Sequence, residues 1–247
     1  MRHGPAMAQD QPADGAPHLN PMLDRARLAA EFARNGHVQI PQVLTLDSAQ
    51  RIHACLTEET VFRLVCNDGE TQLDYSDLAP AERQAHTRAA WRRVGIDAFQ
   101  YLYEQHILTL EGEPYADPGH YWARVTAFLN GQSFLDLARA VTGMPDIAFA
   151  DAQASLYRSG HFLTAHGDEA KGANRLAAYV LSLTPRWRAE WGGLLEFIGA
   201  DGHIAAGYVP NFNSLRLFRV PINHHVSCVA PFAMAGRYSI TGWLRAR

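Results

Sequence analysis

The second half of the chain constrains the fold most, because it is a succession of short apolar segments separated by turns. The change occurs near Met144-Pro145, where helical periodicity gives way to segments rich in β-branched and aromatic residues. Several short strands at such spacing indicate a sandwich or barrel of antiparallel sheets. We expect strands at 147–157, 162–168, 176–183, 194–198, 215–220, 224–229 and 237–244.

The first half has the longer periodicity that is typical of helices. Leu28 and Phe32 are four residues apart and therefore share one helical face, and Asn35-Gly36 is a plausible helix end. The alternating segment 38–40 then predicts a short strand. We expect mainly helical structure before the β core.

Three further helices are predicted in this half. One is expected to begin at Asp47 or Ser48, because either side chain can cap a helix. Segments 87–108 and 119–143 also have helical periodicity. In the second of them, one face should be buried, formed by Leu135, Leu137 and Val141.

The predicted domain organisation is simple. Residues 1–20 are small, polar and proline-containing, which predicts a flexible leader. Residues 21–247 are expected to form one domain, with helical support at 21–143 and the β core at 144–247. Segment 67–88 is polar and rich in turn residues, which indicates a loop or a lid.

Composition excludes several classes of protein. With 47% hydrophobic and 19% charged residues, the 247-residue chain can bury a substantial core. A net charge of −3 gives no electrostatic reason to expect nucleic acid or an anionic membrane as partner. The sequence has no uninterrupted run of about 18 apolar residues, so we do not expect a transmembrane helix. Three cysteines, without zinc-site spacing, indicate reduced thiols and a cytoplasmic location.

The most informative local motif is a histidine and an aspartate one residue apart. Residues i and i+2 of an extended strand point to the same side, so His166 and Asp168 would converge. Two ligands make a poor metal site, and such a pair alone also occurs on protein surfaces without a role. A third ligand is therefore required.

The segment "NHHVSCV" offers that third ligand. His224 and His225 are adjacent, so on a strand only one of them can face His166 and Asp168. Two histidines and one carboxylate suit non-haem Fe(II) and leave coordination positions open.

The segment "GRYSITGWL" adds a candidate anion site. Arg237 and Ser239 share a strand face by the same period of two. A guanidinium beside a hydroxyl is a good receptor for a carboxylate, because arginine offers two donors in a fixed geometry.

Together these pieces resemble one enzyme family. From Tyr157 to the C-terminus the chain resembles the prolyl-hydroxylase-like branch of the 2-oxoglutarate- and Fe(II)-dependent oxygenases. The matching pieces, in the family's order, are "LYRSGHFLTAHGD", "LSLTPRWRAEWGGLLEFI", "YVPNFNSLRLFRVPINHHVSCV" and "GRYSITGWL". The resemblance implies a mixed α+β fold, with a double-stranded β-helix (jelly roll) core flanked by N-terminal helices.

The resemblance also assigns roles to residues. It makes His166, Asp168 and His224 the iron ligands and favours His224 over His225, because the family has a His-x-Val segment there. It makes Arg237 the partner of the distal carboxylate of 2-oxoglutarate.

Two further positions would lie near the co-substrate. Tyr157 would either touch 2-oxoglutarate or be an ordinary tyrosine of the sheet core. Ser239 would either donate a hydrogen bond to the same carboxylate or have no role beyond its place in the alternation of the strand. In one respect the chain departs from the family, because Ser182 stands where many members have a tyrosine. The distal carboxylate is then held differently, by Ser239 or Thr241.

The function that follows is hydroxylation of an unactivated C–H bond, most readily of a prolyl residue in a protein or peptide. Fe(II), 2-oxoglutarate and O2 are the implied cofactor and co-substrates, with ascorbate in support. The retained Asp168 favours hydroxylation over halogenation. The alternatives are a hydroxylase of a free amino acid or small natural product, and a metal-binding jelly-roll sensor or scaffold without turnover. Neither nucleic acid nor membrane is expected as a partner.

Overall fold

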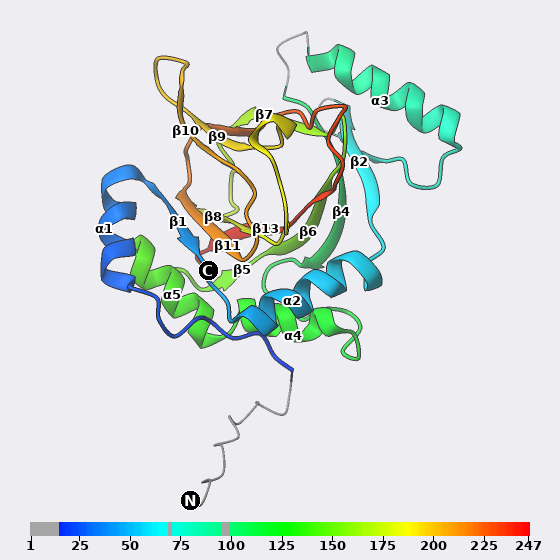
Figure 1. The fold of residues 1–247 in the computed structure, drawn as a ribbon. Coiled ribbons are helices and arrows are strands. Elements are labelled where there is room, and N and C mark those ends of the chain that lie inside the picture. The colour runs from blue at the N-terminus through cyan, green and yellow to red at the C-terminus, as the bar shows by residue number, and fades with distance from the viewer. Residues whose placement is uncertain (1–14, 69–70, 95–98) are drawn as a thin grey trace, which may run out of the picture.

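The protein is built around one strongly curled antiparallel sheet (Figure 1). The computed structural model describes residues 15–68, 71–94 and 99–247. Within these ranges the main strand order is β1-β11-β8-β13-β6-β4-β7-β12-β9-β10, with β2 and β3 added beside β4 and with β5 beside β13. The strands are β1 His37–Pro41, β2 Arg63–Asp68, β3 Thr71–Asp74, β4 Tyr101–Thr109, β5 Phe149–Ala150, β6 Ala152–Tyr157, β7 Phe162–His166, β8 Arg175–Ser182, β9 Leu195–Ile198, β10 Ile204–Tyr208, β11 Ser214–Arg219, β12 His224–Val226 and β13 Arg237–Arg245.

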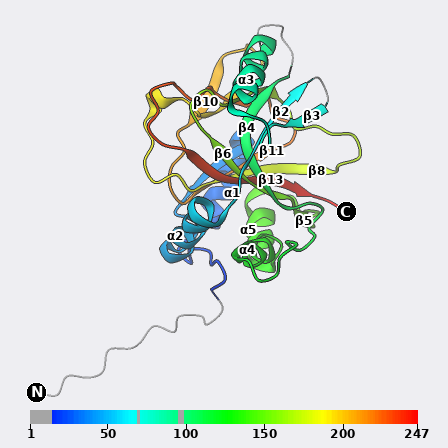
Figure 2. The same ribbon diagram turned by 90° about the vertical axis from the view of Figure 1, so that its right-hand side faces the viewer.

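Most of the helices cover one side of this sheet. In Figures 1 and 2, α1, α2, α4 and α5 gather below the curl, whereas α3 lies apart from them at the other end. None of the helices in the described ranges is long and apolar enough to cross a membrane. The helices are α1 Arg25–Asn35, α2 Leu46–Ala54, α3 Pro80–Val94, α4 Tyr121–Leu129 and α5 Gln132–Thr142, with a π-helical turn at Cys55–Glu59 after α2 and a 3₁₀ turn at Ala189–Trp191.

The central strands have two buried faces with different contents. Leu181, Leu215 and Leu217 belong to the large apolar core that the helices cover. Val180 and Phe218, which alternate with these residues, pack in a second cluster on the other face, inside the curl. The outer core fixes the strands against the helices, so the inner face is free to carry polar side chains.

Several expectations for the helices and the first strand are confirmed. Helix α1 ends at Asn35, where Gly36 adopts a left-handed conformation with φ 74°, and it buries Leu28 and Phe32. Strand β1 covers the predicted alternating segment. Helices α4 and α5 lie within 119–143, and α5 buries the three residues predicted for it, Leu135, Leu137 and Val141.

Two predictions for the first half are wrong. The polar segment 67–88 is no simple loop, because it contains the end of β2, all of β3 and the start of α3, with 69–70 outside the described residues. Segment 87–108 is helical only to Val94, and its second part forms β4. Within β4, Tyr101, Tyr103 and Gln105 line the cavity, so these polar side chains do not mark a solvent-facing helix surface.

Other boundaries also differ from the prediction. Helix α2 begins at Leu46 after the N-cap Thr45, rather than at Asp47 or Ser48. The sheet is not confined to 144–247, since β1 to β4 come from the first half. The predicted leader lies outside the described residues up to position 14, but Leu19 already pairs with Leu44 in a β-bridge.

A buried asparagine ties the turn before β11 to the segment before α2. Asn213 has φ 53°, a left-handed conformation that asparagine tolerates better than most residues. Its side chain accepts a hydrogen bond from the Leu44 amide at 2.9 Å and donates one to the Leu44 carbonyl at 2.8 Å. Asn213 therefore braces a turn.

We predict that Asn213→Ala lowers the free energy of unfolding by about 2–4 kcal/mol, because it removes two hydrogen bonds and leaves the buried groups of Leu44 unpaired. Urea unfolding measures the change. The matched control is Asn211→Ala, at an exposed position of the same turn. Equal stability of the two variants would contradict the bracing role.

Candidate active site

The end of β7 and the start of β12 bring two histidines together. His166 is the last residue of β7 and pairs directly with His224, the first residue of β12. Asp168 lies just beyond β7 and has φ 63°. A left-handed turn, rather than a continuing strand, therefore directs its carboxylate toward the two histidines. The strand-alternation argument thus predicted the convergence of His166 and Asp168 for a reason that does not hold at Asp168.

The three side chains converge closely. His166 Nε2 lies 3.3 Å from Asp168 Oδ1, and His224 Nε2 lies 3.5 Å from Asp168 Oδ2. Two ligand atoms at right angles, each about 2.1 Å from a metal ion, are separated by roughly 3 Å. The spacing of the three groups therefore fits a single ion between them.

Backbone carbonyls orient both imidazoles. His166 Nδ1 lies 2.9 Å from the Thr164 carbonyl, and His224 Nδ1 lies 2.9 Å from the Ile222 carbonyl. Since a carbonyl only accepts, each Nδ1 carries the proton and each Nε2 presents a lone pair. Burial, and then the neighbouring His166, lower the pKa of His224 to about 4, which keeps it neutral. The two Nε2 lone pairs and the Asp168 carboxylate are all electron-pair donors, so a cation bound between them would stabilise the arrangement.

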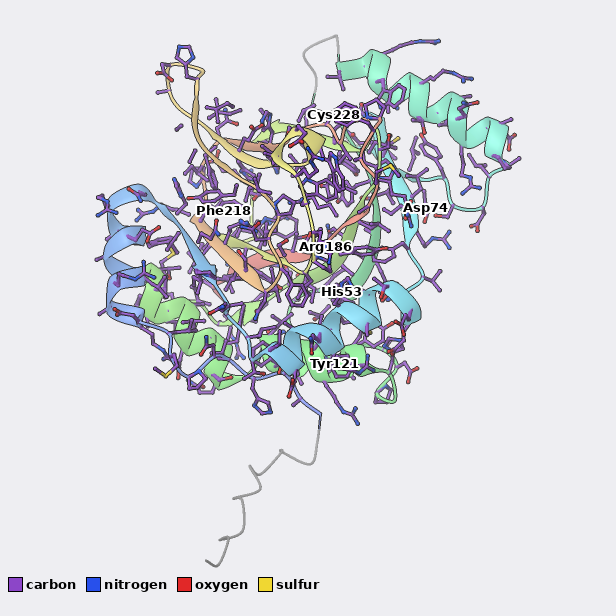
Figure 3. The ribbon with its side chains drawn as sticks, in the orientation of Figure 1. His53, Asp74, Tyr121, Arg186, Phe218 and Cys228 are labelled. Atoms are coloured by element: carbon purple, nitrogen blue, oxygen red, sulfur yellow. The ribbon has the colours of Figure 1, made fainter. Side chains whose placement is uncertain are left out.

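The adjacent histidine is engaged elsewhere. His225 Nε2 lies 2.7 Å from Glu196 Oε2, on the other side of β12. His224 instead packs against Phe218, with ring centroids 4.6 Å apart, and Phe218 is seen within the curl of the sheet in Figure 3. Of the two histidines, only His224 joins His166 and Asp168.

A cavity of about 630 Å³ inside the curl includes these three residues in its wall. Arg175 and Trp243 lie at one end, beside Asp168, and we call this end the mouth. The other end is formed by Arg237 and Tyr157, which are only 3% and 4% exposed, and we call it the deep end.

The arginine at the deep end has no counter-charge. No carboxylate in the described part of the chain forms an ion pair with Arg237, and its buried Nε has no hydrogen-bond partner. Its guanidinium carbon lies 4.9 Å from the centre of the Tyr157 ring, which in turn stacks on Tyr103. Burial lowers the pKa of Arg237. A buried, unpaired guanidinium facing a cavity is a receptor for an anion.

Hydroxyl groups surround this position. Ser239 is fully buried between Arg237 and Thr241 on β13, and its Oγ has no partner. Thr241 lines the cavity and lies 3.1 Å from the hydroxyl of Ser155. Ser182 pairs with Ser239 across β8 and β13, whereas Tyr179 belongs to the outer core and donates to the Asp151 carbonyl.

The residues at the mouth include one that sequence reasoning missed. The Arg175 guanidinium lies 3.5 Å over the Trp243 ring, and its Nη1 donates to the Asp168 carbonyl at 2.9 Å. A single arginine in a polar turn gave no signal of this role, although its position shortly after Asp168 placed it nearby.

A second group of potential ligands occurs in the described part of the chain, formed by Cys55, Glu59 and His120. Here the carboxylate is already engaged, because Arg51 contacts both Glu59 oxygens. In the His166 group no guanidinium competes for Asp168 Oδ1 or Oδ2. The His166 group is therefore the better cation site.

Comparisons with known proteins agree with this fold and site. The model of the 2OG-Fe(II) oxygenase superfamily matches residues 152–245. The prolyl 3-hydroxylase OGFOD1 of Mus musculus is 31% identical over 99 residues, which cover 38% of this chain and 18% of that protein. The chain thus matches less than a fifth of the length of that relative.

Two solved structures share the fold. A Pseudomonas putida prolyl-4-hydroxylase has a TM-score of 0.54 at 20% identity and covers 90% of this chain and 99% of its own. A Trichoplax adhaerens prolyl hydroxylase, in complex with a hypoxia inducible factor peptide fragment, has a TM-score of 0.60 at 17% identity. The match covers 90% of this chain and 89% of that chain.

Residues 152–245 therefore resemble the 2OG-Fe(II) oxygenase superfamily, and the chain shares the jelly-roll fold of these prolyl hydroxylase structures. Both the family resemblance and the fold expected from the sequence are confirmed. The description of the matched superfamily names 2OG and Fe(II).

We predict that His224→Ala loses metal binding, whereas His225→Ala retains it, because only His224 directs a lone pair at Asp168. His166→Ala and Asp168→Ala should behave like His224→Ala. Calorimetric titration with Co(II), which imidazole and carboxylate also bind, measures this without turnover. Circular dichroism checks that each variant is folded. Loss of Co(II) binding in His225→Ala but not in His224→Ala would contradict the assignment.

Proposed function

We propose that this protein is an Fe(II)- and 2-oxoglutarate-dependent dioxygenase that hydroxylates an unactivated C–H bond of a prolyl residue in a protein or peptide. The main support for the proposal is a single cavity that contacts both a candidate metal site and a candidate anion site. It has a His-Asp-His group in its wall and an unpaired buried arginine at its deep end. A metal and a dicarboxylate would together satisfy both.

In this proposal His166, Asp168 and His224 hold Fe(II). When bound, Fe(II) supplies the activation of O2 that C–H hydroxylation requires, and ascorbate supports the reaction by keeping the iron reduced. The two carbonyl-bound imidazoles keep their Nε2 atoms aimed at one point. Three protein ligands leave positions for co-substrates.

The residues of the deep end hold and orient the co-substrate. Arg237 pairs with the distal carboxylate of 2-oxoglutarate, and the ring of Tyr157 keeps the guanidinium in place. Ser239 and Thr241 are the nearest hydroxyls on the same strand face. Because Arg237 is almost fully buried, water does not compete for its charge, so the contact is stronger than at a surface.

The mouth offers contacts that a peptide substrate can use. Arg175 offers donors that a peptide carbonyl can accept, and Trp243 offers an apolar ring beside them. The relatives named as prolyl hydroxylases support the same substrate class. We also propose a single domain over 21–247 and a cytoplasmic location, the latter supported by three free cysteines among the described residues.

The test is succinate formation from 2-oxoglutarate by purified protein with Fe(II) and ascorbate. We expect proline-containing peptides to raise succinate formation, with a mass increase of one oxygen in the peptide. Stimulation by free amino acids alone would favour the small-molecule hydroxylase. Absence of succinate together with absence of 2-oxoglutarate binding would leave only the sensor or scaffold.

We predict that Arg237→Ala weakens 2-oxoglutarate binding by roughly 10–100-fold, because a hydrogen bond to a charged group contributes about 1.5–3 kcal/mol. Metal binding should be unchanged. Arg237→Lys should recover only part of the affinity, since an ammonium lacks the two-pronged geometry. Calorimetric titration of the protein with Mn(II), followed by titration of the Mn(II)-loaded protein with 2-oxoglutarate, measures the two affinities. Arg247→Ala, near the exposed C-terminus, is the control, and equal affinity in all variants would contradict the role of Arg237.

A further inference from the structure

A second arginine is buried on the inner face of the sheet. Arg216 lies in the middle of β11 and is 2% exposed. Its neighbours Leu215 and Leu217 point into the helix-covered core, and Phe218 packs inside the curl. Period-two alternation therefore places the Arg216 side chain on the same face of the strand as Phe218, which lines the cavity.

The contacts of Arg216 do not neutralise it. Its Nη2 donates to the Val209 carbonyl at 2.5 Å, and its guanidinium carbon lies 5.7 Å from the centre of the Tyr208 ring. Its Nε is buried without a partner, and no carboxylate in the part of the chain that the structure describes pairs with it. A desolvated cation that is held by one carbonyl is energetically costly. An anion bound beside it would lower this cost.

Arg216 and Arg237 act on each other electrostatically. Burial, and then the positive charge of Arg237, lower the pKa of Arg216 to about 9. The Arg216 side chain reaches toward the end of β10. This end lies near Arg237, because β10 pairs with β9, and a Cβ atom at Gly193, just before β9, would lie 3.3 Å from Arg237 Cδ. Two like charges are therefore buried at the same end of the curl.

Three serines lie in one row across β11, β8 and β13, and the two outer strands of these three carry Arg216 and Arg237. Ser214 pairs with Ser182, and Ser182 pairs with Ser239. All three are at most 1% exposed, and each hydroxyl lacks a partner. With the Nε atoms of Arg216 and Arg237, they form a group of buried polar atoms that have no protein partner. Such a group is rare without a ligand or water to satisfy it.

We propose that Arg216 is a second cationic arm of the co-substrate site, which with the serine row and Arg237 receives the distal carboxylate of a 2-oxo dicarboxylic acid. The proposal rests on the proposed function and deepens it. A carboxylate between two guanidiniums relieves their repulsion, and its two oxygens can accept from both. Removing the Arg216 charge would then weaken the binding of dicarboxylic 2-oxo acids and leave that of monocarboxylic ones unchanged.

The test compares two ligands in Mn(II)-loaded protein by calorimetry. One ligand is 2-oxoglutarate, and the other is 2-oxopentanoate, which has the same chain length but no distal carboxylate. The variants are Arg216→Met, which keeps bulk without charge, and Arg216→Lys. Arg219→Met, on an exposed residue of the same strand, is the matched control.

We expect Arg216→Met to weaken 2-oxoglutarate binding by roughly 10-fold or more, the effect of losing a hydrogen bond to a charged group. Binding of 2-oxopentanoate should change little, and Arg216→Lys should recover part of the loss. The increase in melting temperature that saturating 2-oxoglutarate produces should be smaller in Arg216→Met than in wild type.

A purely structural Arg216, which only ties β11 to Val209, gives a different result. The ligand-free Arg216→Met would then melt earlier, but its 2-oxoglutarate affinity and ligand-induced shift would equal those of wild type, and the proposal would fall. Equal losses for both ligands would also overturn it. If wild type itself binds no 2-oxoglutarate, the proposed function fails and not this inference alone.

Discussion

The pairing of β7 with β12 is the constraint on which the rest of the site depends. It sets His166 opposite His224 in the register, and the left-handed turn at Asp168 then closes the third side. A slip of one residue would direct His225 at the site instead of His224. His225 is held on the other side by Glu196, which is a second interaction favouring the observed register.

A polar interior is possible because the outer face of the sheet provides the stability. The helices and the outward side chains of β8, β11 and β13 form one continuous apolar core. The inner face of the same strands can therefore carry Arg216, Arg237 and the buried serines, although these side chains oppose folding when no anion is bound. The protein keeps a costly interior that a charged co-substrate would stabilise.

The sequence allowed the motif residues to be found, but only part of the architecture. His166, Asp168, His224 and Arg237 stand in segments whose order resembles the family, so they were identifiable. Strand β4 was missed because Gln105, a polar residue that lines the cavity, looks in the sequence like a solvent-facing one. Arg216 was missed for the same reason, since alternation separates two faces of a strand without telling which face is enclosed.

The proposed mechanism requires that one cavity holds a metal and 2-oxoglutarate in contact with each other. It is tested most directly by adding 2-oxoglutarate, without oxygen, to wild-type protein loaded with Fe(II). We predict a metal-to-ligand charge-transfer absorption band that grows and saturates with 2-oxoglutarate and does not form with succinate. Fe(II) binding without any such band would contradict it.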